Sequence, residues 1–394
     1  MTAIPPDAVV GVLGAGAMGA GIAQVALARG HAVVLGDASA EALARAHAGI
    51  AAALRREVGK GRLAAGADEA ALARLTVAAD DPALGAFSAC AMVIEAIIER
   101  LDAKQAAFGA LERAVGADCV LATNTSSLSV ASVAAACARP GRVLGVHFFN
   151  PAPVMPLVEL VPGIATEPAV LAAARDCMER WGKVPVVAAD TPGFIVNRIA
   201  RPFYGEALRI LEEGTADAAT IDWAMRELGG FRMGPFELMD FIGNDVNYAV
   251  TRSVWEAFFY DARYRPSFTQ RRLVEAGFLG RKTGRGYYDY AQAERPAPTE
   301  DEALGREILE RVLAMLVNEA ADAVRLGVAS AADVELAMTK GVNYPKGLLA
   351  WGDEYGPARL VARLEALRDE YQEERYRVSP LLRRVARDGG RLLP

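Results

Sequence analysis

Short apolar runs alternate with amphipathic segments along the first half of the chain. Apolar runs of this length, rich in Val, Ile and Leu, are typical of strands buried on both faces of a parallel sheet. They predict strands at 9–13, 32–35, 75–77, 92–94, 119–122, 143–146 and 157–161. Helical periodicity predicts helices at about 18–29, 41–54, 101–115 and 168–180. Alternating strands and helices indicate an α/β fold, with a Rossmann-type doubly wound sheet over residues 1–190.

After Thr191-Pro192-Gly193 the pattern becomes helical, and Pro and Gly at that point indicate a domain boundary. Residues 194–212 are too apolar for a surface helix, so we expect a buried helix with a kink at Pro202. A linker-like stretch, 292–300, contains Pro296 and Pro298. The sequence therefore predicts two all-α helical domains after the sheet. The first, 191–293, is of a substrate or dimerisation type, and the second spans 300–394.

The second helical region repeats the first at an offset of 113 residues. This regularity predicts that 300–394 is a second copy of the helical domain. At the same offset Asn197 falls on Glu310, so the copy lacks whatever Asn197 does, and we expect it to pack rather than to catalyse. The matching positions are Glu206-Ala207 with Glu319-Ala320, Gly214 with Gly327, Ala224-Met225 with Ala337-Met338, Gly234 with Gly347, Asp240 with Asp353, and Gly243 with Gly356.

The composition is that of a folded globular protein, with 53% hydrophobic and 23% charged residues. A net charge of −6 argues against a nucleic-acid-binding surface. The four cysteines form no C-x-x-C pair, so we expect no zinc or other metal and a reducing compartment. The longest uncharged run, 119–138, contains Thr, Asn and Ser and does not predict a membrane span. No basic segment precedes the first apolar run, and we expect a cytoplasmic protein without a membrane partner.

The segment Gly14-Ala15-Gly16-Ala17-Met18-Gly19 lies between a predicted strand and a predicted helix, which is the context of a dinucleotide-binding loop. Gly14 permits the tight turn, Gly16 lets the backbone approach a pyrophosphate, and Gly19 lets helix and strand pack closely. Asp37 ends the next predicted strand, where it would accept hydrogen bonds from the adenosine ribose and repel a 2′-phosphate. The sequence therefore predicts NAD rather than NADP.

His147 ends one apolar run and Glu159 lies inside the next. Imidazole titrates near neutral pH and can accept a proton, and a carboxylate bonded to its far nitrogen would fix the tautomer. The pair is a candidate general base with its partner. A buried structural histidine beside a solvated glutamate explains the same residues equally well.

Further polar residues follow the predicted strands at 92–94 and 119–122, at the edge where doubly wound sheets bind ligands. Glu95, Glu99 and Lys104 follow the first of these strands, and residues 124–127, Asn-Thr-Ser-Ser, follow the second. Ordinary turn and helix-cap chemistry is the alternative explanation for both. A basic cluster at the end of the second predicted helix is either a solvated helix end or a contact for a phosphate-bearing substrate arm. It comprises Arg55, Arg56, Lys60 and Arg62.

Together these motifs resemble the L-3-hydroxyacyl-CoA dehydrogenase family from Val9 to about Tyr290. The resemblance rests on the ordered set GAGAMG (14–19), VIEAIIE (93–99), NTSSL (124–128), HFFNP (147–151), DTPGFIVNR (190–198), MGPFEL (233–238) and GRKTGRGYY (280–288).

The resemblance implies the roles of individual residues. The catalytic base falls on His147 and its carboxylate partner on Glu159, with Ser126 and Asn197 orienting the substrate. Lys60 corresponds to a lysine that meets the CoA moiety, whereas the neighbouring serine of that CoA site is Ala53 here. The implied NAD contacts are Gly14, Gly16, Met18, Gly19, Asp37, Glu99, Lys104, Ser126, Asn150 and Lys282.

The reaction that the resemblance implies is L-3-hydroxyacyl-CoA + NAD⁺ ⇌ 3-oxoacyl-CoA + NADH + H⁺, as in fatty-acid β-oxidation or related acyl-CoA metabolism. In shorter family members the helical domain forms a homodimer interface. We therefore expect either a monomer whose second copy is an internal partner or a homodimer.

Two alternatives remain at this point: a sister hydroxyacid dehydrogenase that does not act on CoA esters, and a non-catalytic dinucleotide-binding protein. The sister enzyme would use a lysine and would not need His147 or Glu159. None of the eleven tyrosines has a lysine four positions on, which disfavours a tyrosine-base dehydrogenase. The acyl group cannot be read from the sequence. Arg55, Arg56 and Arg201 are candidate anchors for a distal carboxylate, but solvation or packing explains them as well.

Overall fold

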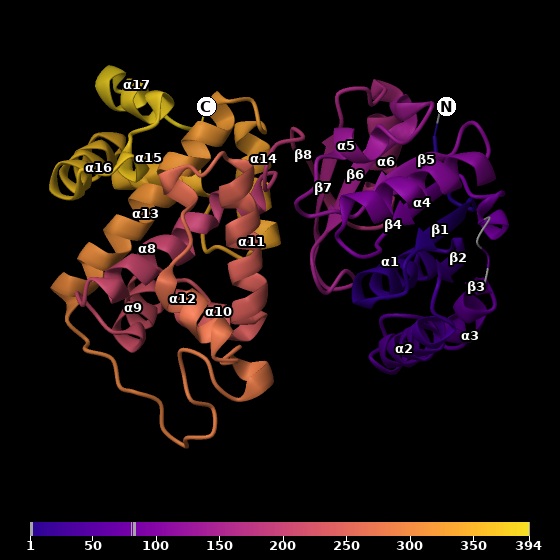
Figure 1. Ribbon diagram of the computed structural model, residues 1–394, viewed down its shortest axis with the longest axis horizontal. Coiled ribbons are helices and arrows are strands. Elements are labelled where there is room, and N and C mark those ends of the chain that lie inside the picture. The colour runs from indigo at the N-terminus through magenta and orange to yellow at the C-terminus, as the bar shows by residue number, and fades with distance from the viewer. Residues whose placement is uncertain (1–2, 80, 82–83, 394) are drawn as a thin grey trace. The chain divides into compact units, whose positions relative to one another are not determined.

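The computed structural model describes residues 3–79, 81 and 84–393. The chain divides between Thr191 and Pro192 into two compact units. Figure 1 shows the first as a sheet with flanking helices and the second as helices joined by loops. No helix among the described residues is both long and apolar enough to cross a membrane.

The first unit is an α/β domain, as the alternating pattern predicts. Its strands are β1 (Val9–Leu13), β2 (Ala32–Asp37), β3 (Leu75–Ala79), β4 (Met92–Glu95), β5 (Val120–Thr123), β6 (Val143–Phe148), β7 (Leu157–Pro162) and β8 (Val184–Val187). Its helices are α1 (Ala17–Ala28), α2 (Ala40–Gly59), α3 (Ala67–Leu72), α4 (Leu101–Ala114), α5 (Val130–Ala134) and α6 (Pro168–Arg180), with short 3₁₀ turns at Gly85–Phe87 and Pro140–Arg142.

The described strands form one sheet in the order β3-β2-β1-β4-β5-β6-β7-β8. The first six have the order typical of a doubly wound dinucleotide-binding sheet, and all their pairings are parallel. Strand β7 runs antiparallel to β6, and β8 runs parallel to β7. The predicted Rossmann-type fold is therefore confirmed, with an antiparallel turn of the chain between β6 and β7.

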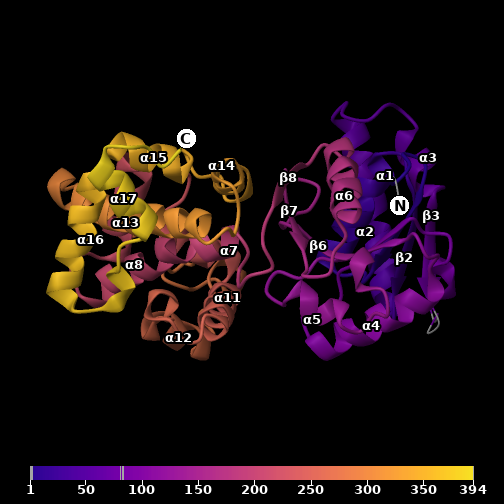
Figure 2. The same cartoon turned by 90° about the horizontal axis from the view of Figure 1, so that it is seen from above.

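Helices cover both faces of this sheet, as Figure 2 shows for α1 and α6 on one side and α4 and α5 on the other. Side chains of α1, α2 and α6 share one core with alternate strand residues, and Ile22, Ile50 and Trp181 are almost wholly buried in it. On the opposite face, Phe108 and Leu111 of α4 are fully buried. Burial on both faces explains why these strands read as continuous apolar runs.

Two features of this unit differ from the sequence-based expectation. Strand β8 was not predicted, because Val184–Val187 is short and contains Pro185. Proline is tolerated there because β8 pairs only with β7, at the edge of the sheet. Helix α2 continues to Gly59 rather than ending near residue 54, so Arg56 lies in its last turn and Lys60 is its C-cap.

The second unit is all-helical. Its elements are α7 (Val196–Ile199), α8 (Arg201–Glu212), α9 (Ala218–Trp223), a π-helical turn (Ala224–Leu228), α10 (Pro235–Ile242), α11 (Asn244–Ala257), 3₁₀ turns at Ala262–Tyr264 and Arg281–Thr283, α12 (Phe268–Glu275), α13 (Glu302–Arg325), α14 (Ala331–Gly341), α15 (Leu348–Tyr355), α16 (Pro357–Tyr371), a 3₁₀ turn at Glu374–Tyr376 and α17 (Pro380–Asp388). The predicted kink appears as a break at Ala200, because Pro202 cannot donate a helical hydrogen bond.

The helices repeat with the offset that the sequence predicts. Helix α15 begins and ends 113 residues after α10, and α13 ends 113 residues after α8. Gly243 and Gly356 each join two helices with a positive φ, at 103° and 98°, a conformation that favours glycine. The division of this unit into domains 191–293 and 300–394 stays a prediction, and the repeated elements support it.

The hydrogen bonds that hold each copy together repeat as well. In the first copy the Asp222 carboxylate accepts hydrogen bonds from the first-turn N–H groups of Phe236 and Glu237, both at 2.9 Å. In the second copy Glu335, 113 positions on, accepts hydrogen bonds from the N–H groups of Leu349 and Ala350. An acid, buried in the first copy and partly exposed in the second, thus caps the same helix start in both copies.

The two copies are joined by a buried polar cluster that obeys an approximate two-fold relation. Glu206 of the first copy is 1% exposed and accepts hydrogen bonds from Arg311, Arg375 and Tyr376 of the second, each at 3.0 Å.

Glu319, the equivalent of Glu206, is fully buried and accepts hydrogen bonds from Arg198, Arg263 and Tyr264 of the first copy at 2.6, 2.8 and 2.6 Å. Arg311 follows Arg198 by 113 positions, whereas Arg375 and Tyr376 follow Arg263 and Tyr264 by 112, because one residue fewer precedes this turn in the second copy. Each glutamate therefore binds the equivalents of the residues that bind the other glutamate, which is the arrangement of a two-fold interface. Figures 1 and 2 show α8 and α13, which carry the two glutamates, side by side.

Candidate active site

The three glycines of the loop between β1 and α1 have three different steric roles. Gly14 has φ of 108°, and a Cβ there would lie 2.5 Å from the Ala96 carbonyl oxygen. A Cβ on Gly19 would lie 1.8 Å from the Gly14 carbonyl oxygen, so only glycine lets α1 pack this closely. A Cβ on Gly16 would meet nothing within 4 Å. Gly16 is the N-cap of α1, and open space at a helix N-terminus suits a pyrophosphate.

Asp37 lies at the end of β2, beside this loop. Its Oδ2 accepts a hydrogen bond from the Ala15 N–H at 2.7 Å, and its Oδ1 accepts one from the Ser39 N–H at 2.8 Å. Each carboxylate oxygen has a further lone pair with which to accept a ribose hydroxyl. The structure thus brings the predicted ribose acceptor next to the predicted phosphate loop.

The end of β4 carries a buried ion pair. Glu95 is fully buried, and its Oε1 accepts hydrogen bonds from Lys104 Nζ at 2.6 Å and from the Ile97 N–H at 2.7 Å. Its Oε2 accepts one from Thr123 Oγ1 on β5 at 2.7 Å. Lys104 is 1% exposed and also lies 3.2 Å from Glu99. Its ammonium therefore fixes the two carboxylates, and direct contact of Lys104 with NAD stays a prediction.

Glu99 holds the loop that follows β5. It accepts hydrogen bonds from Thr125 Oγ1 at 2.5 Å, the Ser126 N–H at 2.9 Å and Ser127 Oγ at 3.1 Å. Burial alone would raise the pKa of Glu99, but the Lys104 ammonium and these hydrogen bonds outweigh it and lower that pKa. An ionised Glu99 thus positions the backbone of Ser126.

Two residues whose role the sequence did not reveal fix the surroundings of this loop. Asn124 Oδ1 accepts a hydrogen bond from the Phe148 N–H at 2.8 Å, which ties the end of β5 to the end of β6. Asp190 accepts hydrogen bonds from Ser129 Oγ and from the N–H groups of Val130 and Ala131, and so caps α5. Both residues belong to the family motifs, but their partners are too distant in sequence to be inferred from spacing.

His147 and Glu159 are direct cross-strand partners in the antiparallel pairing of β6 with β7. His147 Nδ1 lies 2.6 Å from Glu159 Oε2, and the two residues are 6% and 0% exposed. The Phe149 ring packs against the imidazole, with centroids 4.5 Å apart. A carboxylate at Nδ1 favours the tautomer with its proton on that nitrogen and stabilises an imidazolium. The arrangement can accept a proton at Nε2.

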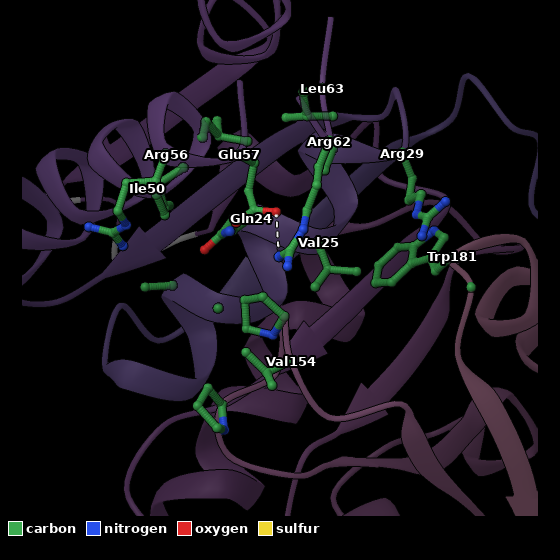
Figure 3. Close-up of a pocket in the computed structure, with 18 of the residues that line it drawn as sticks. Gln24, Val25, Arg29, Ile50, Arg56, Glu57, Arg62, Leu63, Val154 and Trp181 are labelled. Carbon is green, nitrogen blue, oxygen red and sulfur yellow. Dashed lines mark hydrogen bonds and ion pairs between the residues drawn. The ribbon is translucent and has the colours of Figure 1, made fainter. Parts of the chain in front are cut away.

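A cavity of about 1030 Å³ lies between α1, α2 and the loop that joins β6 to β7. It brings Lys60 together with Asn150, and its wall includes Ala53. Figure 3 shows Arg56, Glu57 and Arg62 over this cavity, with Arg62 bound to Glu57. The basic residues of its wall are Arg29, Arg56, Lys60, Arg62 and Lys183, against the one acidic residue Glu57.

Lys183 in this wall was not predicted as a site residue. Its Nζ donates hydrogen bonds to the carbonyl oxygens of Ala152 and Met155 at 2.5 and 2.8 Å, and so ties down the β6–β7 loop. Burial, together with the nearby Arg29 guanidinium, lowers the pKa of Lys183 to about 8. No short sequence pattern marks this residue, because its acceptors are backbone atoms about thirty positions away.

The predicted site residues of the helical unit have different surroundings. Asn197 is partly exposed, whereas the other residues of α7 are buried. Lys282 Nζ lies 2.6 and 2.7 Å from the two carboxylate oxygens of Asp245. Its predicted contact with NAD, like the predicted contact of Asn197 with substrate, stays a prediction.

Other kinds of site find little support in the described part of the chain. It contains no group of three or more His, Cys, Asp or Glu side chains arranged to hold a metal ion. The four cysteines are free and buried. Burial raises the pKa of each thiol, to about 12 for Cys90 and Cys119 and about 11 for Cys137 and Cys177, so none is activated as a nucleophile.

Comparison with known proteins agrees with this geometry. The model of the 3-hydroxyacyl-CoA dehydrogenase NAD-binding domain matches residues 9–191. The model of the C-terminal domain of the same enzymes matches residues 193–290 and 308–391. The chain belongs to the 3-hydroxyacyl-CoA dehydrogenase family. It is therefore an NAD-dependent oxidoreductase, and the open space at Gly16 beside Asp37 fits that cofactor.

Individual family members resemble the chain closely. The 3-hydroxyadipyl-CoA dehydrogenase of Escherichia coli (strain K12) is 41% identical, over 96% of this chain and 97% of its own. The 3-hydroxybutyryl-CoA dehydrogenase of Bradyrhizobium diazoefficiens is 43% identical, over 74% of this chain and 97% of its own. A crystal structure of 3-hydroxybutyryl-CoA dehydrogenase from Escherichia coli K12 superposes with a TM-score of 0.91 at 40% identity, over 96% of this chain and 98% of that one.

Proposed function

We propose that the chain oxidises L-3-hydroxyacyl-CoA esters to 3-oxoacyl-CoA with His147 as general base and Glu159 as its partner. The observation that carries the proposal is the 2.6 Å contact between His147 Nδ1 and Glu159 Oε2 at the end of β6. Ligands of doubly wound sheets bind outside the carboxyl ends of the strands, which is where this imidazole lies.

In the proposed reaction His147 Nε2 takes the proton of the substrate 3-hydroxyl as the carbonyl bond forms at C3. NAD, when bound, supplies the nicotinamide that accepts the hydride from C3. Glu159 holds the proton on Nδ1 and stabilises the imidazolium until its proton leaves for solvent. In the reverse direction the imidazolium returns its proton to the carbonyl oxygen of the 3-oxoacyl ester.

Ser126 and Asn197 orient the substrate in this proposal, so that C3 faces the nicotinamide. The role of Ser126 is supported by the hydrogen bond from its backbone N–H to Glu99, which holds the loop that carries the Ser126 hydroxyl. Support for Asn197 is its partial exposure on a helix that is otherwise buried.

The cavity beside α2 binds the CoA arm in this proposal. Its wall carries an excess of cations, and CoA carries a pyrophosphate and a 3′-phosphate, which lysine and arginine bind by charge-assisted hydrogen bonds. Lys60 takes the role of the CoA-contacting lysine, and Asn150 belongs to the same wall. Ala53 cannot supply the hydroxyl that the family's serine provides there.

We place the reaction in acyl-CoA degradation of the β-oxidation type, in the cytoplasm. The names of the relatives indicate two different acyl groups. One Escherichia coli relative is named for a hydroxyadipyl ester, and the enzyme of the similar crystal structure is named for a hydroxybutyryl ester.

The test is NADH formation, measured by absorbance, with CoA esters and free acids of the same hydroxyacyl groups. A panel of 3-hydroxybutyryl, 3-hydroxyhexanoyl and 3-hydroxyadipyl compounds covers chain length and terminal charge. The proposal predicts NADH from CoA esters and no more than trace turnover of the free acids. Equal rates with the free acids would instead indicate a hydroxyacid dehydrogenase that makes no use of CoA.

A further inference from the structure

We infer that Arg201 binds a terminal carboxylate of the acyl chain, so that the preferred substrate is a 3-hydroxyacyl-CoA derived from a dicarboxylic acid. The inference rests on the proposed function, because it takes the substrate to lie beside Asn197. It names the acyl class that the sequence and the relatives leave open.

Arg201 is a buried cation without a carboxylate. Arg201 is only 7% exposed. No carboxylate among the described residues lies within ion-pair distance of its guanidinium group. The groups that contact its guanidinium are neutral. Nε donates to the Asn197 carbonyl oxygen at 2.9 Å, Nη1 donates to Thr251 Oγ1 at 3.1 Å, and the guanidinium lies over the Tyr204 ring.

Such a residue is costly in a folded protein. Arginine stays protonated, and a buried charge without a counter-ion raises the free energy of the folded state. Burial lowers the pKa of Arg201, which reflects the same penalty. Other buried arginines of this unit, such as Arg263 and Arg311, have carboxylate partners. A bound anion would remove the imbalance at Arg201.

The fold itself does not require an arginine at this position. In the second copy the residue 113 positions on is Ala314, which is fully buried. The equivalents of Tyr204 and Thr251 are Val317 and Leu364, also fully buried. The polar cluster around Arg201 thus occurs only in the copy that carries Asn197.

Arg198 shows what a structural arginine looks like in the same repeat. Its equivalent is Arg311, and both bind the buried glutamate of the other copy. A residue needed for packing is therefore kept in both copies, whereas Arg201 is not. This contrast separates a role in ligand binding from a role in the scaffold.

The position of Arg201 suits a short dicarboxylyl chain. Arg201 follows Asn197 by four positions, and its Nε bonds to the carbonyl of Asn197. A substrate whose C3 oxygen meets Asn197 would bring a carboxylate a few carbons further along within reach of the guanidinium, which binds carboxylates with two parallel hydrogen bonds.

The test compares 3-hydroxyadipyl-CoA with 3-hydroxyhexanoyl-CoA, which has the same number of acyl carbons and no terminal charge. The wild type should show the higher kcat/KM on the adipyl ester. In Arg201→Met, which keeps the apolar stem, the ratio of the two kcat/KM values should fall about 10- to 100-fold. Arg201→Lys, which keeps the charge without the planar fork, should retain part of the preference.

Arg209→Met is the matched control, because Arg209 lies on the same helix and pairs with Glu373. Its selectivity ratio should stay within about 3-fold of the wild type. A ratio that Arg201→Met leaves unchanged, or a wild type without preference for the charged ester, would overturn the inference. A ratio that falls equally in both variants would do the same.

A binding measurement separates this inference from the proposed function. Adipyl-CoA and hexanoyl-CoA lack the 3-hydroxyl and cannot be oxidised, so their dissociation constants report on the terminal carboxylate alone. The wild type should bind adipyl-CoA more tightly, and Arg201→Met should abolish the difference; equal affinities in the wild type would contradict the inference. If no 3-hydroxyacyl-CoA yields NADH, the proposed function fails, while these affinities still decide the role of Arg201.

Discussion

Arg375 of the second helical copy donates a hydrogen bond to Glu206 of the first at 3.0 Å, with both side chains almost wholly buried. Burial alone would raise the pKa of Glu206, but Arg375 and Arg311 outweigh it and lower that pKa. The glutamate is therefore ionised inside the interface between the copies. Its equivalent, Glu319, is held in the same way by the first copy.

Glu206→Gln should destabilise the chain by about 1.5 to 3 kcal/mol, because Arg311 and Arg375 lose the buried carboxylate that they share and keep only the partly exposed Glu213 and Glu373. The measurement is the free energy of unfolding in urea. Glu227→Gln is the control, since Glu227 forms an exposed pair with Arg226 and should cost less than about 1 kcal/mol. Similar losses in the two variants would mean that the buried cluster contributes no more than a surface pair.

Removing residues 294–394 should convert the chain into a dimer. The shortened chain would expose apolar surface and would leave Arg198, Glu206 and Arg263 without their partners. A second shortened chain can supply equivalent residues, because the contacts obey a two-fold relation. Light scattering coupled to size exclusion measures the state. A shortened chain that stays monomeric and as heat-stable as the full chain would contradict the packing role.

The loop glycines should separate cofactor binding from folding. Gly16→Val places its side chain in open space, so the melting temperature should hold while NAD affinity falls at least about 10-fold, equivalent to about 1.4 kcal/mol. Gly19→Ala places a Cβ 1.8 Å from a backbone oxygen and should lower the melting temperature. NAD titration and thermal unfolding measure the two effects. Unchanged NAD affinity in Gly16→Val would show that the cofactor does not approach this loop.

Lys60→Ala and Arg56→Ala should raise KM for a 3-hydroxyacyl-CoA with little change in kcat, because contacts with a remote phosphate act equally on substrate and transition state. The control substrate is the same acyl group on N-acetylcysteamine, which lacks the phosphates and should show the same KM in variants and wild type. An equal rise in KM on both substrates would place these cations outside a CoA site.

Much of the sheet could be predicted from the sequence because local periodicity and turn residues specify each element. The strand–glycine loop–helix unit follows from a short pattern. The residues alone left the contact between His147 and Glu159 open, and only the family resemblance implied it. The ties made by Asn124, Asp190 and Lys183 could not be predicted, because their partners lie in other elements. Strand β8 was missed because an edge strand needs little apolar sequence of its own.

The repeat in the helical unit could be predicted from the sequence because identical residues recur at one offset. The exchange of partners between Glu206 and Glu319 could not, since a sequence period does not say whether a residue pairs within its copy or across copies. The lack of a carboxylate beside Arg201 could not be predicted from the sequence either. It depends on every element that packs around the guanidinium, and only the fold specifies those neighbours.

The most direct test of the account is the turnover of His147→Gln with a 3-hydroxyacyl-CoA at saturating NAD. NAD affinity should stay close to that of the wild type, since the glycine loop and Asp37 are untouched. The account predicts that kcat falls about 10²- to 10⁴-fold, because a positioned base contributes that much. A kcat within a few-fold of the wild type would show that His147 does not carry the proton.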